Sequence, residues 1–241
     1  MIPTTFSSGP SNAIEKISWT FEEPASAYDR AVIIAYGSDG LAPKWKPEIE
    51  RHAKELASAG ILALIPDYFD KDPPTPHDSS ESVFSQILFR HQEWAQVLRD
   101  AVESAKTLPN IDATKVGLIG FSLGGFLGLR IRDSIDVMTE YFSPYQFPPN
   151  VDLGPLTPLK GLGTNANPKL KILIHHGNAD RLVPINLNAT PIKADLLAEG
   201  AMITVNHHPG ANHGFQGDDP ENKAARRTSL EETVQFFKDN L

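Results

Sequence analysis

A serine flanked by glycines follows an apolar run in the segment KVGLIGFSLGGFLG, residues 115–128. Ser122 is the centre of a G-x-S-x-G pattern that runs from Gly120 to Gly124. A reactive serine in this pattern lies on a sharp turn between a buried strand and a helix, where its hydroxyl is exposed. Small neighbours leave room for the strand and the helix to approach closely. The pattern alone is common, but its position between a strand and a helix predicts a nucleophile. A serine that only caps the helix is the alternative.

A nucleophilic serine requires a general base and an acid that orients the base. The segment KILIHHGNADRLVP places Asp180 just after an apolar run, and AMITVNHHPGANHGF places His213 after the next one. The order serine, acid, histidine is that of the α/β hydrolases. All three residues follow the carboxyl ends of predicted strands, where open α/β sheets bind ligands. The sequence therefore predicts a Ser122–Asp180–His213 triad, with Asp180 as a simple turn residue the alternative.

An acyl-transfer site also needs two backbone N–H groups for the oxyanion. We expect one from Leu123, the residue after the nucleophile, and the other from the loop after the first core strand. In that loop, IIAYGSDGLAPKW, Gly37 permits a backbone turn and Ser38 is the expected donor. Loss of one such donor typically costs about 3–4 kcal/mol of transition-state stabilisation. Tyr36 and Gly37 are expected to border the substrate, although Tyr36 fits a core aromatic equally well.

Four other histidines form two pairs, His175–His176 and His207–His208. His207 and His208 compete with His213 for the role of base, but they end a predicted strand, where packing or solvent exposure is the simpler interpretation. His175 and His176 end another strand and are interpreted as structural. Because neither pair has acidic residues at ligand spacing, we expect no metal site. No cofactor is expected either.

The elements that would position these residues alternate along the chain. Continuous apolar runs predict strands that are buried on both faces, at 31–37, 61–69, 115–121, 171–177 and 201–208. The segment 18–24 alternates and predicts an edge strand or hairpin arm. Amphipathic stretches predict helices near 45–56 and 94–105, ended in the first case by Gly60. Two more helices should begin at the capping pairs Thr190-Pro191 and Asp219-Pro220. This alternation predicts a mostly parallel α/β sheet covered by helices.

Length, charge and composition limit the class of protein. A chain of 241 residues suits one large domain or two small ones, and we expect a single domain over 1–241. The formal charge of −8 with scattered basic residues argues against nucleic acid and anionic membranes as partners. No segment approaches the roughly 18 apolar residues of a membrane span, and no secretory signal is recognisable. The absence of cysteine excludes disulfides and fits a cytoplasmic location. The chain is expected to be a monomer or a homodimer.

Two regions interrupt the alternation of strands and helices. One is the proline-rich segment 69–80, and the other is the aromatic, Pro- and Gly-rich segment at about 141–168. Long loops inside a domain are lids, binding loops or mobile linkers. Because exposed aromatic side chains are unfavourable, we expect 141–168 to be a lid or a binding loop.

The segments VIIAYGSDG, ALIPDYF, GFSLGG, HGNADRLVP and ANHGF, in this order, resemble the dienelactone hydrolase family of the α/β-hydrolase superfamily. The resemblance runs from about residue 20 to residue 241. It implies the α/β-hydrolase fold, with a mostly parallel central sheet of about eight strands and helices on both faces. It also implies a Ser/Cys–Asp–His triad.

The sequence departs from this family at three places. Ser122 stands where dienelactone hydrolases have cysteine, and Gly37 stands where they have glutamate. They also have an arginine just after the histidine, where Gln216 and Gly217 follow here. Arg90 could supply a cation instead, although a surface helix residue is the simpler interpretation. These departures favour a neutral acyl ester over an anionic lactone.

The expected activity is therefore hydrolysis of a small-molecule carboxylic ester through an acyl-enzyme. A serine-dependent lactone or dienelactone hydrolase is an alternative within enzymes. A non-catalytic α/β-hydrolase scaffold that binds a small molecule or a protein is the alternative outside them.

Overall fold

The computed structural model describes residues 2–10, 15–69 and 80–241. The predicted proline-rich loop at 69–80 lies almost entirely outside the described residues. One eight-stranded sheet organises the chain, in the order β1-β2-β4-β3-β5-β6-β9-β10. Its strands are β1 Thr5–Ser8, β2 Glu15–Glu22, β3 Ala31–Ala35, β4 Leu62–Pro66, β5 Val116–Phe121, β6 Val137–Tyr141, β9 Lys171–Gly177 and β10 Met202–His208.

The sheet is parallel from β4 to β10, whereas β1 and β2 are antiparallel to their neighbours. The five predicted core strands are confirmed. The segment 18–24 belongs to β2, which is an arm of the β1–β2 pair and not an edge strand, because β1 lies outside it. The structure adds β6, which the sequence did not predict. The arrangement is that of the α/β-hydrolase fold.

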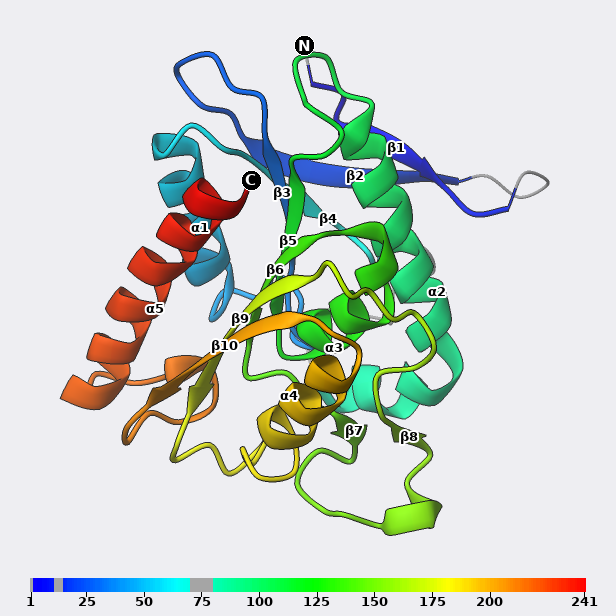
Figure 1. Cartoon of the computed structure of the whole chain (residues 1–241), viewed down its shortest axis with the longest axis vertical. Coiled ribbons are helices and arrows are strands. Elements are labelled where there is room, and N and C mark those ends of the chain that lie inside the picture. The colour runs from blue at the N-terminus through cyan, green and yellow to red at the C-terminus, as the bar shows by residue number, and fades with distance from the viewer. Residues whose placement is uncertain (1, 11–14, 70–79) are drawn as a thin grey trace.

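Helices cover both faces of the sheet (Figure 1). Helices α1 and α5 lie on one face, and α2, α3 and α4 lie on the other. Their bounds are α1 Lys46–Ser58, α2 Ser80–Lys106, α3 Leu123–Arg130, α4 Ala189–Ala198 and α5 Pro220–Asn240. Three short 3-10 turns complete the helical elements, η1 Arg132–Ser134, η2 Gly154–Leu156 and η3 His213–Phe215.

Helix boundaries follow the expected signals in most places. Gly60 follows α1 with a φ of +81°, and Asp219 caps α5 by accepting the N–H of Asn222 at 2.9 Å. The prediction for α4 was wrong by two residues, since the helix begins at Ala189 and the N-cap is Asn188. The Asn188 amide binds the carbonyl oxygen of Pro149 instead, at 2.9 Å, which ties α4 to the 141–168 segment.

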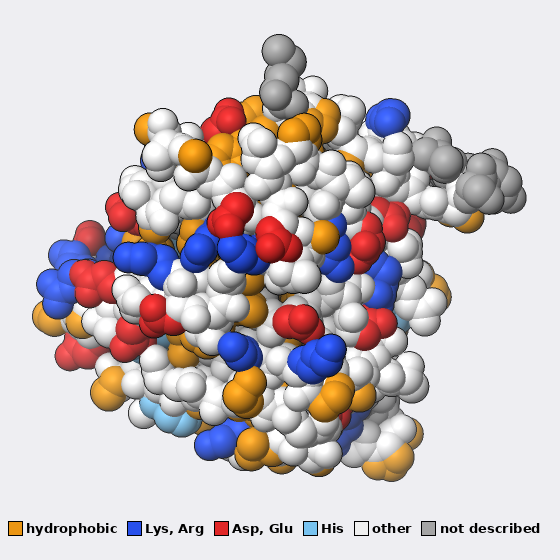
Figure 2. Space-filling model, turned by 45° about the horizontal axis from the view of Figure 1, so that its top comes forward, with side chains coloured by type: hydrophobic (Ala, Val, Ile, Leu, Met, Phe, Trp, Pro, Cys, Tyr) orange, Lys and Arg blue, Asp and Glu red, His pale blue; other side chains and the backbone are white. Residues whose placement is uncertain are grey.

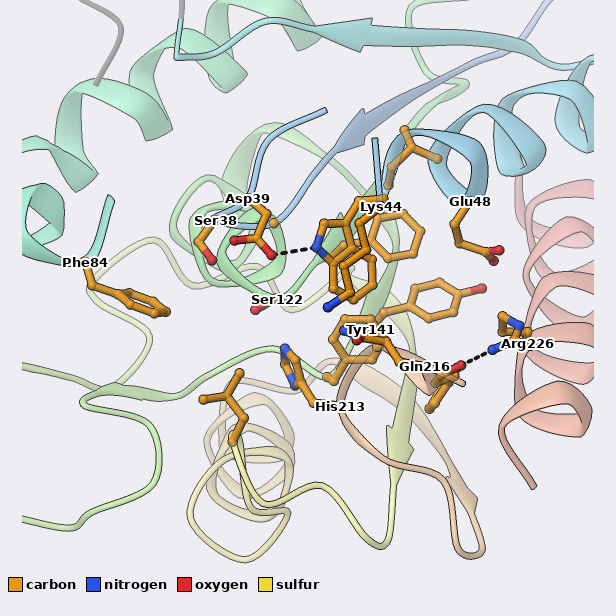
Figure 3. Close-up of a pocket in the computed structure, with 18 residues that line it drawn as sticks. Ser38, Asp39, Lys44, Glu48, Phe84, Ser122, Tyr141, His213, Gln216 and Arg226 are labelled. Carbon is orange, nitrogen blue, oxygen red and sulfur yellow. Dashed lines mark hydrogen bonds between the residues drawn. The ribbon is translucent and has the colours of Figure 1, made fainter. Parts of the chain in front are cut away.

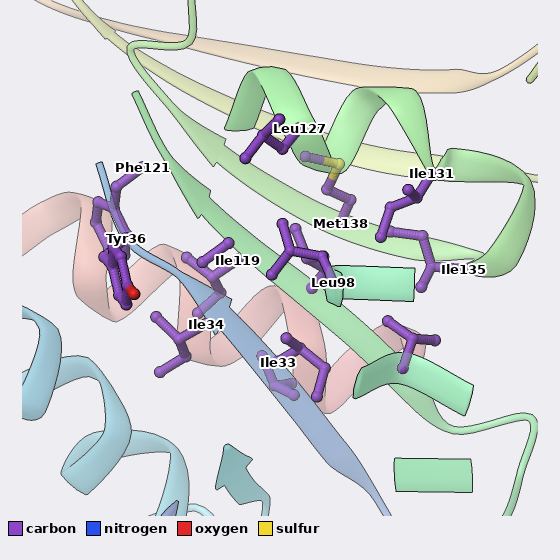
Figure 4. Packing of buried hydrophobic residues seen from close by; sticks show 14 of the residues in the cluster. Ile33, Ile34, Tyr36, Leu98, Ile119, Phe121, Leu127, Ile131, Ile135 and Met138 are labelled. Carbon is purple, nitrogen blue, oxygen red and sulfur yellow. The ribbon is translucent and has the colours of Figure 1, made fainter. Parts of the chain in front are cut away.

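The core lies on both sides of the central strands. Ile33 and Ile34 are consecutive in β3 and point to opposite faces, yet both are fully buried. Figure 4 shows Leu98 of α2 and Leu127 of α3 among the side chains that pack there. Burial of one such aliphatic side chain contributes about 1.5–3 kcal/mol. The sheet edge that carries the loops is therefore held by a rigid, two-sided core.

The 141–168 segment is folded and contains a small hairpin. Strands β7 Gln146–Phe147 and β8 Leu159–Lys160 pair antiparallel, with Gln146 opposite Lys160. The Gln146 amide donates to the carbonyl oxygen of Val151 at 2.8 Å and so closes the hairpin loop. We call residues 146–160 the β7–β8 hairpin.

Charged side chains of both signs are interspersed on the face shown in Figure 2. Within the described part of the chain, no helix is long and apolar enough to cross a membrane.

Candidate active site

Ser122 occupies the turn between β5 and α3. Its backbone has φ 49° and ψ −113°, a conformation that L-residues rarely adopt. The turn is fixed by the Ser122 N–H, which donates to the carbonyl oxygen of Tyr141 at 2.9 Å, and by the Ser122 carbonyl, which accepts from Gly125 and Phe126. Strain that the surroundings impose in this way is typical of reactive sites.

Glycine is required around Ser122 because a Cβ at these positions would come too close to neighbouring atoms. A Cβ on Gly124 would lie 2.1 Å from the carbonyl oxygen of Ala35, and one on Gly120 would lie 2.4 Å from the Cα of Gly125. The clash predicted from the sequence is therefore confirmed at both positions. Gly125 serves the same packing, since its Cβ would lie 1.6 Å from the Ser143 hydroxyl.

Asp180 and His213 form a hydrogen-bonded pair. The Nδ1 of His213 lies 2.8 Å from Oδ2 of Asp180, and Oδ1 of Asp180 accepts the Val183 N–H at 2.7 Å. Because a carboxylate accepts hydrogen bonds, the proton of the neutral imidazole resides on Nδ1. The Nε2 atom is then left with a free lone pair. The Asp180 side chain is fully buried and that of His213 is 14% exposed, so the imidazole alone can reach a substrate.

A close contact between β9 and the loop after β10 brings this pair together. A Cβ on Gly177 would lie 2.3 Å from the carbonyl oxygen of Ala211. The Ala179 N–H donates to the same oxygen at 2.9 Å, and the Asn178 N–H donates to the His208 carbonyl at 3.0 Å. Asp180 follows this junction directly, which fixes the distance between the acid and the histidine.

The turn of residues 212–217, which we call the histidine turn, carries His213 and is held by side chains. Asn212 donates from Nδ2 to the Gln216 carbonyl at 2.9 Å and accepts the Gln216 N–H at 2.7 Å. Asn222 of α5 accepts the Asn212 N–H at 3.0 Å. Arg226 of α5 donates to the carbonyl oxygens of Phe215 and Gly217. The position of the imidazole thus depends on the first turns of α5.

Ser122 and His213 line one cavity of about 280 Å³, together with Gly37 and Ser38. Figure 3 shows the imidazole of His213 and the hydroxyl of Ser122 facing the same space. A volume of this size accommodates a small organic group. The structure therefore brings four of the sequence-predicted residues to one pocket.

The predicted oxyanion donors lie beside Ser122. Leu123 is the first residue of α3, so its N–H has no acceptor within the helix. Among the described residues, no backbone carbonyl accepts the N–H of Leu123 or of Ser38. A Cβ on Gly37 would lie 3.4 Å from that of Ser122, which places the Ser38 loop against Ser122. Both N–H groups remain available for a ligand.

Tyr36 and Arg90 do not line this cavity. Tyr36 is fully buried, stacks on Tyr68 with ring centroids 4.4 Å apart, and donates its hydroxyl to Asp67 at 2.6 Å. Tyr36 is thus a core aromatic, and the prediction that it borders the pocket is wrong because it is not among the residues that line the cavity. Arg90 pairs with Glu93 at 3.2 Å on α2, as expected of a surface helix residue.

Three of the four paired histidines are buried in the protein. His176 is buried and its Nε2 donates to the Val183 carbonyl at 2.7 Å. His175 lies 3.1 Å from His208 between ring nitrogens, and burial lowers the pKa of both imidazoles, that of His208 to about 4. His207 is exposed. In the described part of the chain, no three His, Asp or Glu side chains are grouped to hold a metal ion.

Several cavity residues were not found from the sequence. The charged and polar ones are Asp39, Lys44, Glu48, Gln216 and Arg226, and the apolar ones include Trp45, Phe84, Phe142 and Leu182. One signal exists only in the backbone. Three of the four described non-glycine residues with positive φ line the cavity, namely Ser122, Phe142 and Phe215. No sequence motif predicts the positive φ of Phe142 or of Phe215.

Comparison with known proteins agrees with this architecture. The chain is 26% identical over 157 residues to an uncharacterized protein of Caenorhabditis elegans, a match that covers 59% of this chain and 90% of the relative. A dienelactone hydrolase from Anabaena variabilis has a similar structure, with a TM-score of 0.64 at 18% identity over 98% of this chain and 97% of that one.

Two further structures share the fold. A dienelactone hydrolase-like promiscuous phosphotriesterase from metagenomic libraries has a TM-score of 0.74 at 17% identity, covering 98% of this chain and 96% of its own. The acylaminoacyl peptidase of Pyrococcus horikoshii also has a TM-score of 0.74, at 14% identity, and this chain spans only 42% of it.

Residues 19–241, which include the Ser122 turn, the Asp180 loop and the histidine turn, match the dienelactone hydrolase family as a whole. That span covers more than nine tenths of the sequence. The chain therefore belongs to the dienelactone hydrolase family, and its fold is that of a hydrolase.

Proposed function

We propose that the protein hydrolyses carboxylic esters of small molecules, with Ser122 as the nucleophile. The observation that carries this proposal is the shared cavity of Ser122 and His213, in which the Nδ1 of His213 is bonded to Asp180 at 2.8 Å. With Nδ1 occupied, Nε2 is the nitrogen that faces the cavity and can accept a proton. Asp180 orients the imidazole and stabilises its charged form.

In the proposed first half-reaction, Oγ of Ser122 attacks the ester carbonyl carbon while Nε2 of His213 takes the hydroxyl proton. The N–H groups of Leu123 and Ser38 stabilise the oxyanion of the tetrahedral intermediate. Collapse of this intermediate breaks the bond to the alcohol oxygen. The leaving alkoxide takes the proton from His213, and the acyl group stays on Ser122.

In the second half-reaction, a water molecule replaces the alcohol. His213 removes a proton from the water as its oxygen attacks the acyl carbon, and the same N–H groups hold the second oxyanion. The Ser122–acyl bond then breaks, and His213 returns the proton to the serine. The products are the carboxylic acid and the free enzyme.

A neutral ester is favoured over an anionic lactone by the residues at two positions of the cavity. Gln216 stands where the resemblance implies the arginine that binds the substrate carboxylate, and Gly37 stands where it implies the glutamate that partners the cysteine thiol. Neither of these two family groups is present here. A binding scaffold without activity would not need the strained φ of 49° at Ser122.

The test is covalent labelling and turnover. A fluorophosphonate should add one adduct to the protein, seen by intact-mass spectrometry, and Ser122→Ala should remove it. Hydrolysis of p-nitrophenyl acetate should fall by about 10⁴-fold or more in Ser122→Ala, because triad members act as a unit. Ser58→Ala, at an exposed position of α1, is the matched control and should retain both properties.

The same measurement separates the alternatives. A folded protein that is neither labelled nor active would contradict the proposal and would favour the binding scaffold. Faster turnover of a lactone than of an open-chain ester with the same acyl size would favour the lactone hydrolase. A p-nitroanilide cleaved as fast as the matching p-nitrophenyl ester would indicate a peptidase-like activity.

A further inference from the structure

We infer that the ester carries an elongated apolar chain, and that this chain binds in a groove that continues from the catalytic cavity between Phe84 and Leu182. The inference rests on the proposed ester hydrolysis and specifies its substrate class. Phe84 and Leu182 line both the catalytic cavity and a second hollow of about 380 Å³. The two spaces are therefore adjacent and share a wall.

The described lining of this groove is almost entirely apolar. Ile87 and Leu88 of α2 form one side, Phe147, Pro148, Pro149 and Pro158 of the β7–β8 hairpin form the other, and Asn150 is the sole polar residue among the described lining. Proline has no N–H to donate, so three of these residues cannot bind a polar ligand through that group. Such a surface favours a hydrocarbon chain over a polar one.

The catalytic cavity is asymmetric around Ser122, and this gives the chain a direction. Figure 3 shows Phe84 on one side of Ser122, and Glu48, Gln216 and Arg226 on the opposite side. An apolar chain that entered the charged side would remove polar groups from water without replacing their hydrogen bonds. The apolar part of the substrate is therefore directed past Phe84 into the groove.

The groove is preformed by contacts within the protein. Phe147 packs edge-on against Phe126 of α3 with ring centroids 4.9 Å apart, and lies 6.1 Å from Phe84. The buried Asn188 holds the hairpin through the Pro149 carbonyl at 2.9 Å and the Tyr145 N–H at 2.9 Å. A site that is already ordered loses little conformational entropy when it binds a ligand.

Two apolar side chains at the groove are unusually open to solvent. Leu88 is 41% exposed and Leu182 is 44% exposed. Each would lose water-accessible apolar surface when a chain fills the groove, which is the source of the binding free energy. The groove should therefore bind most tightly a chain that is long enough to pass Leu182 and reach Leu88.

The test compares ester series with the wild-type protein. One series holds the alcohol as p-nitrophenol and extends the acyl chain from acetate to decanoate. The other holds the acyl group as acetate and extends a linear alcohol from ethanol to decanol, with acid release followed by pH-stat. In the series whose variable part occupies the groove, kcat/KM should rise about two- to fourfold per methylene over several methylenes.

The series in which kcat/KM rises assigns the groove to the acyl or to the alcohol part of the ester. If acetate esters are hydrolysed but kcat/KM is flat or falls in both series, the inference is wrong while the proposed function stands. If no ester of any length is hydrolysed, both are wrong. The two failures are therefore distinguishable in one experiment.

A pair of variants tests the location of the chain. Leu88→Asp puts a carboxylate in the groove at an exposed helix position and should lower the kcat/KM ratio of the longest to the shortest ester by about tenfold. Leu197→Asp, at a position of α4 that is 54% exposed and outside both hollows, is the matched control. An equal ratio in Leu88→Asp, Leu197→Asp and the wild type would show that the chain binds elsewhere.

Discussion

The two halves of the proposed catalytic site are held by opposite means. The Ser122 turn is held by the absence of side chains, since Gly120, Gly124 and Gly125 let backbone and side-chain atoms approach to distances that a Cβ would forbid. The histidine turn is held by side chains that are present, chiefly Asn212 and Arg226. The proposed nucleophile, Ser122, is therefore positioned by packing, and the proposed base, His213, by hydrogen bonds.

The surroundings of the two turns differ in the same way. Behind the Ser122 turn lie buried polar atoms without a hydrogen-bond partner in the described structure, including Oε1 of Glu140 and Oγ of Ser143. Polar atoms of the histidine turn are paired with α5. Because contact distances hold the first turn and hydrogen bonds hold the second, an added atom should damage the first turn and a removed donor should damage the second.

Gly124→Ala tests the first half of this comparison and has the largest expected effect. The new methyl group would lie 2.1 Å from the Ala35 carbonyl oxygen, so α3 must move away from β3. We expect the free energy of unfolding to fall by about 3 kcal/mol. Displacement of Ser122 by an ångström would lower kcat/KM for p-nitrophenyl acetate by about 100-fold. Chemical denaturation and steady-state kinetics measure the two effects.

Gly60→Ala is the matched control for adding a methyl group at a glycine where no neighbouring atom would clash with it. Gly60 has a positive φ of 81° but no atom within 4 Å of a built Cβ, so the change adds backbone strain of about 1 kcal/mol without a clash. Its catalytic rate should stay at the wild-type level. If Gly124→Ala behaves like Gly60→Ala, contact distance is not what positions Ser122.

Ser122, Asp180 and His213 were all predicted from the sequence, but the residues that support them were predicted only around Ser122, and the contrast explains why. The glycines of the first turn are adjacent to Ser122, so a local motif in an apolar context carries the whole argument. Arg226 follows Gly217 by 9 positions and Phe215 by 11. No sequence motif includes all three residues. Hydrogen bonds of this kind, between a loop and the helix that follows it, form only when α5 packs on the sheet.

Some elements were hidden for a related reason. Strand β6, Val137–Tyr141, contains the polar residues Thr139 and Glu140, which are fully buried. A polar pair in the middle of an apolar run masks the pattern of a buried strand. Tyr36 illustrates the reverse case, because its chain position beside Gly37 suggested the pocket while its side chain points to Tyr68 and Asp67 in the core.

Glu140→Gln tests the buried polar residues that lie behind the Ser122 turn. Glu140 pairs with Gly120 across β5 and β6, and burial raises its pKa from 4.5 to about 7. Below pH 4.5 the carboxyl is protonated in the folded and the unfolded chain. Between pH 4.5 and 7 only the unfolded chain ionises, so the wild type loses stability as pH rises and then levels off.

The free energy of unfolding of Glu140→Gln should not fall with pH in this way, because glutamine does not ionise. We expect its free energy of unfolding to equal that of the wild type near pH 4 and to exceed it by about 3 kcal/mol at pH 8. Denaturation at the two pH values measures the difference, and Glu231→Gln at an exposed position of α5 controls for the lost charge. A stability difference that does not change with pH would mean that Glu140 is ionised at low cost in the fold.

Arg226→Ala tests the second half of the comparison, with the smallest expected effect. The variant removes two hydrogen bonds from a charged donor to the histidine turn, which should lower the free energy of unfolding by about 1–2 kcal/mol. Because Asn212 still ties the turn, His213 is displaced but not lost, and kcat for p-nitrophenyl acetate should fall by about tenfold. KM should hardly change, since a neutral ester offers the guanidinium no charged partner. Arg227→Ala, at the exposed neighbouring position, should leave kcat unchanged. Equal kcat values in the two variants would mean that asparagine side chains alone position the base.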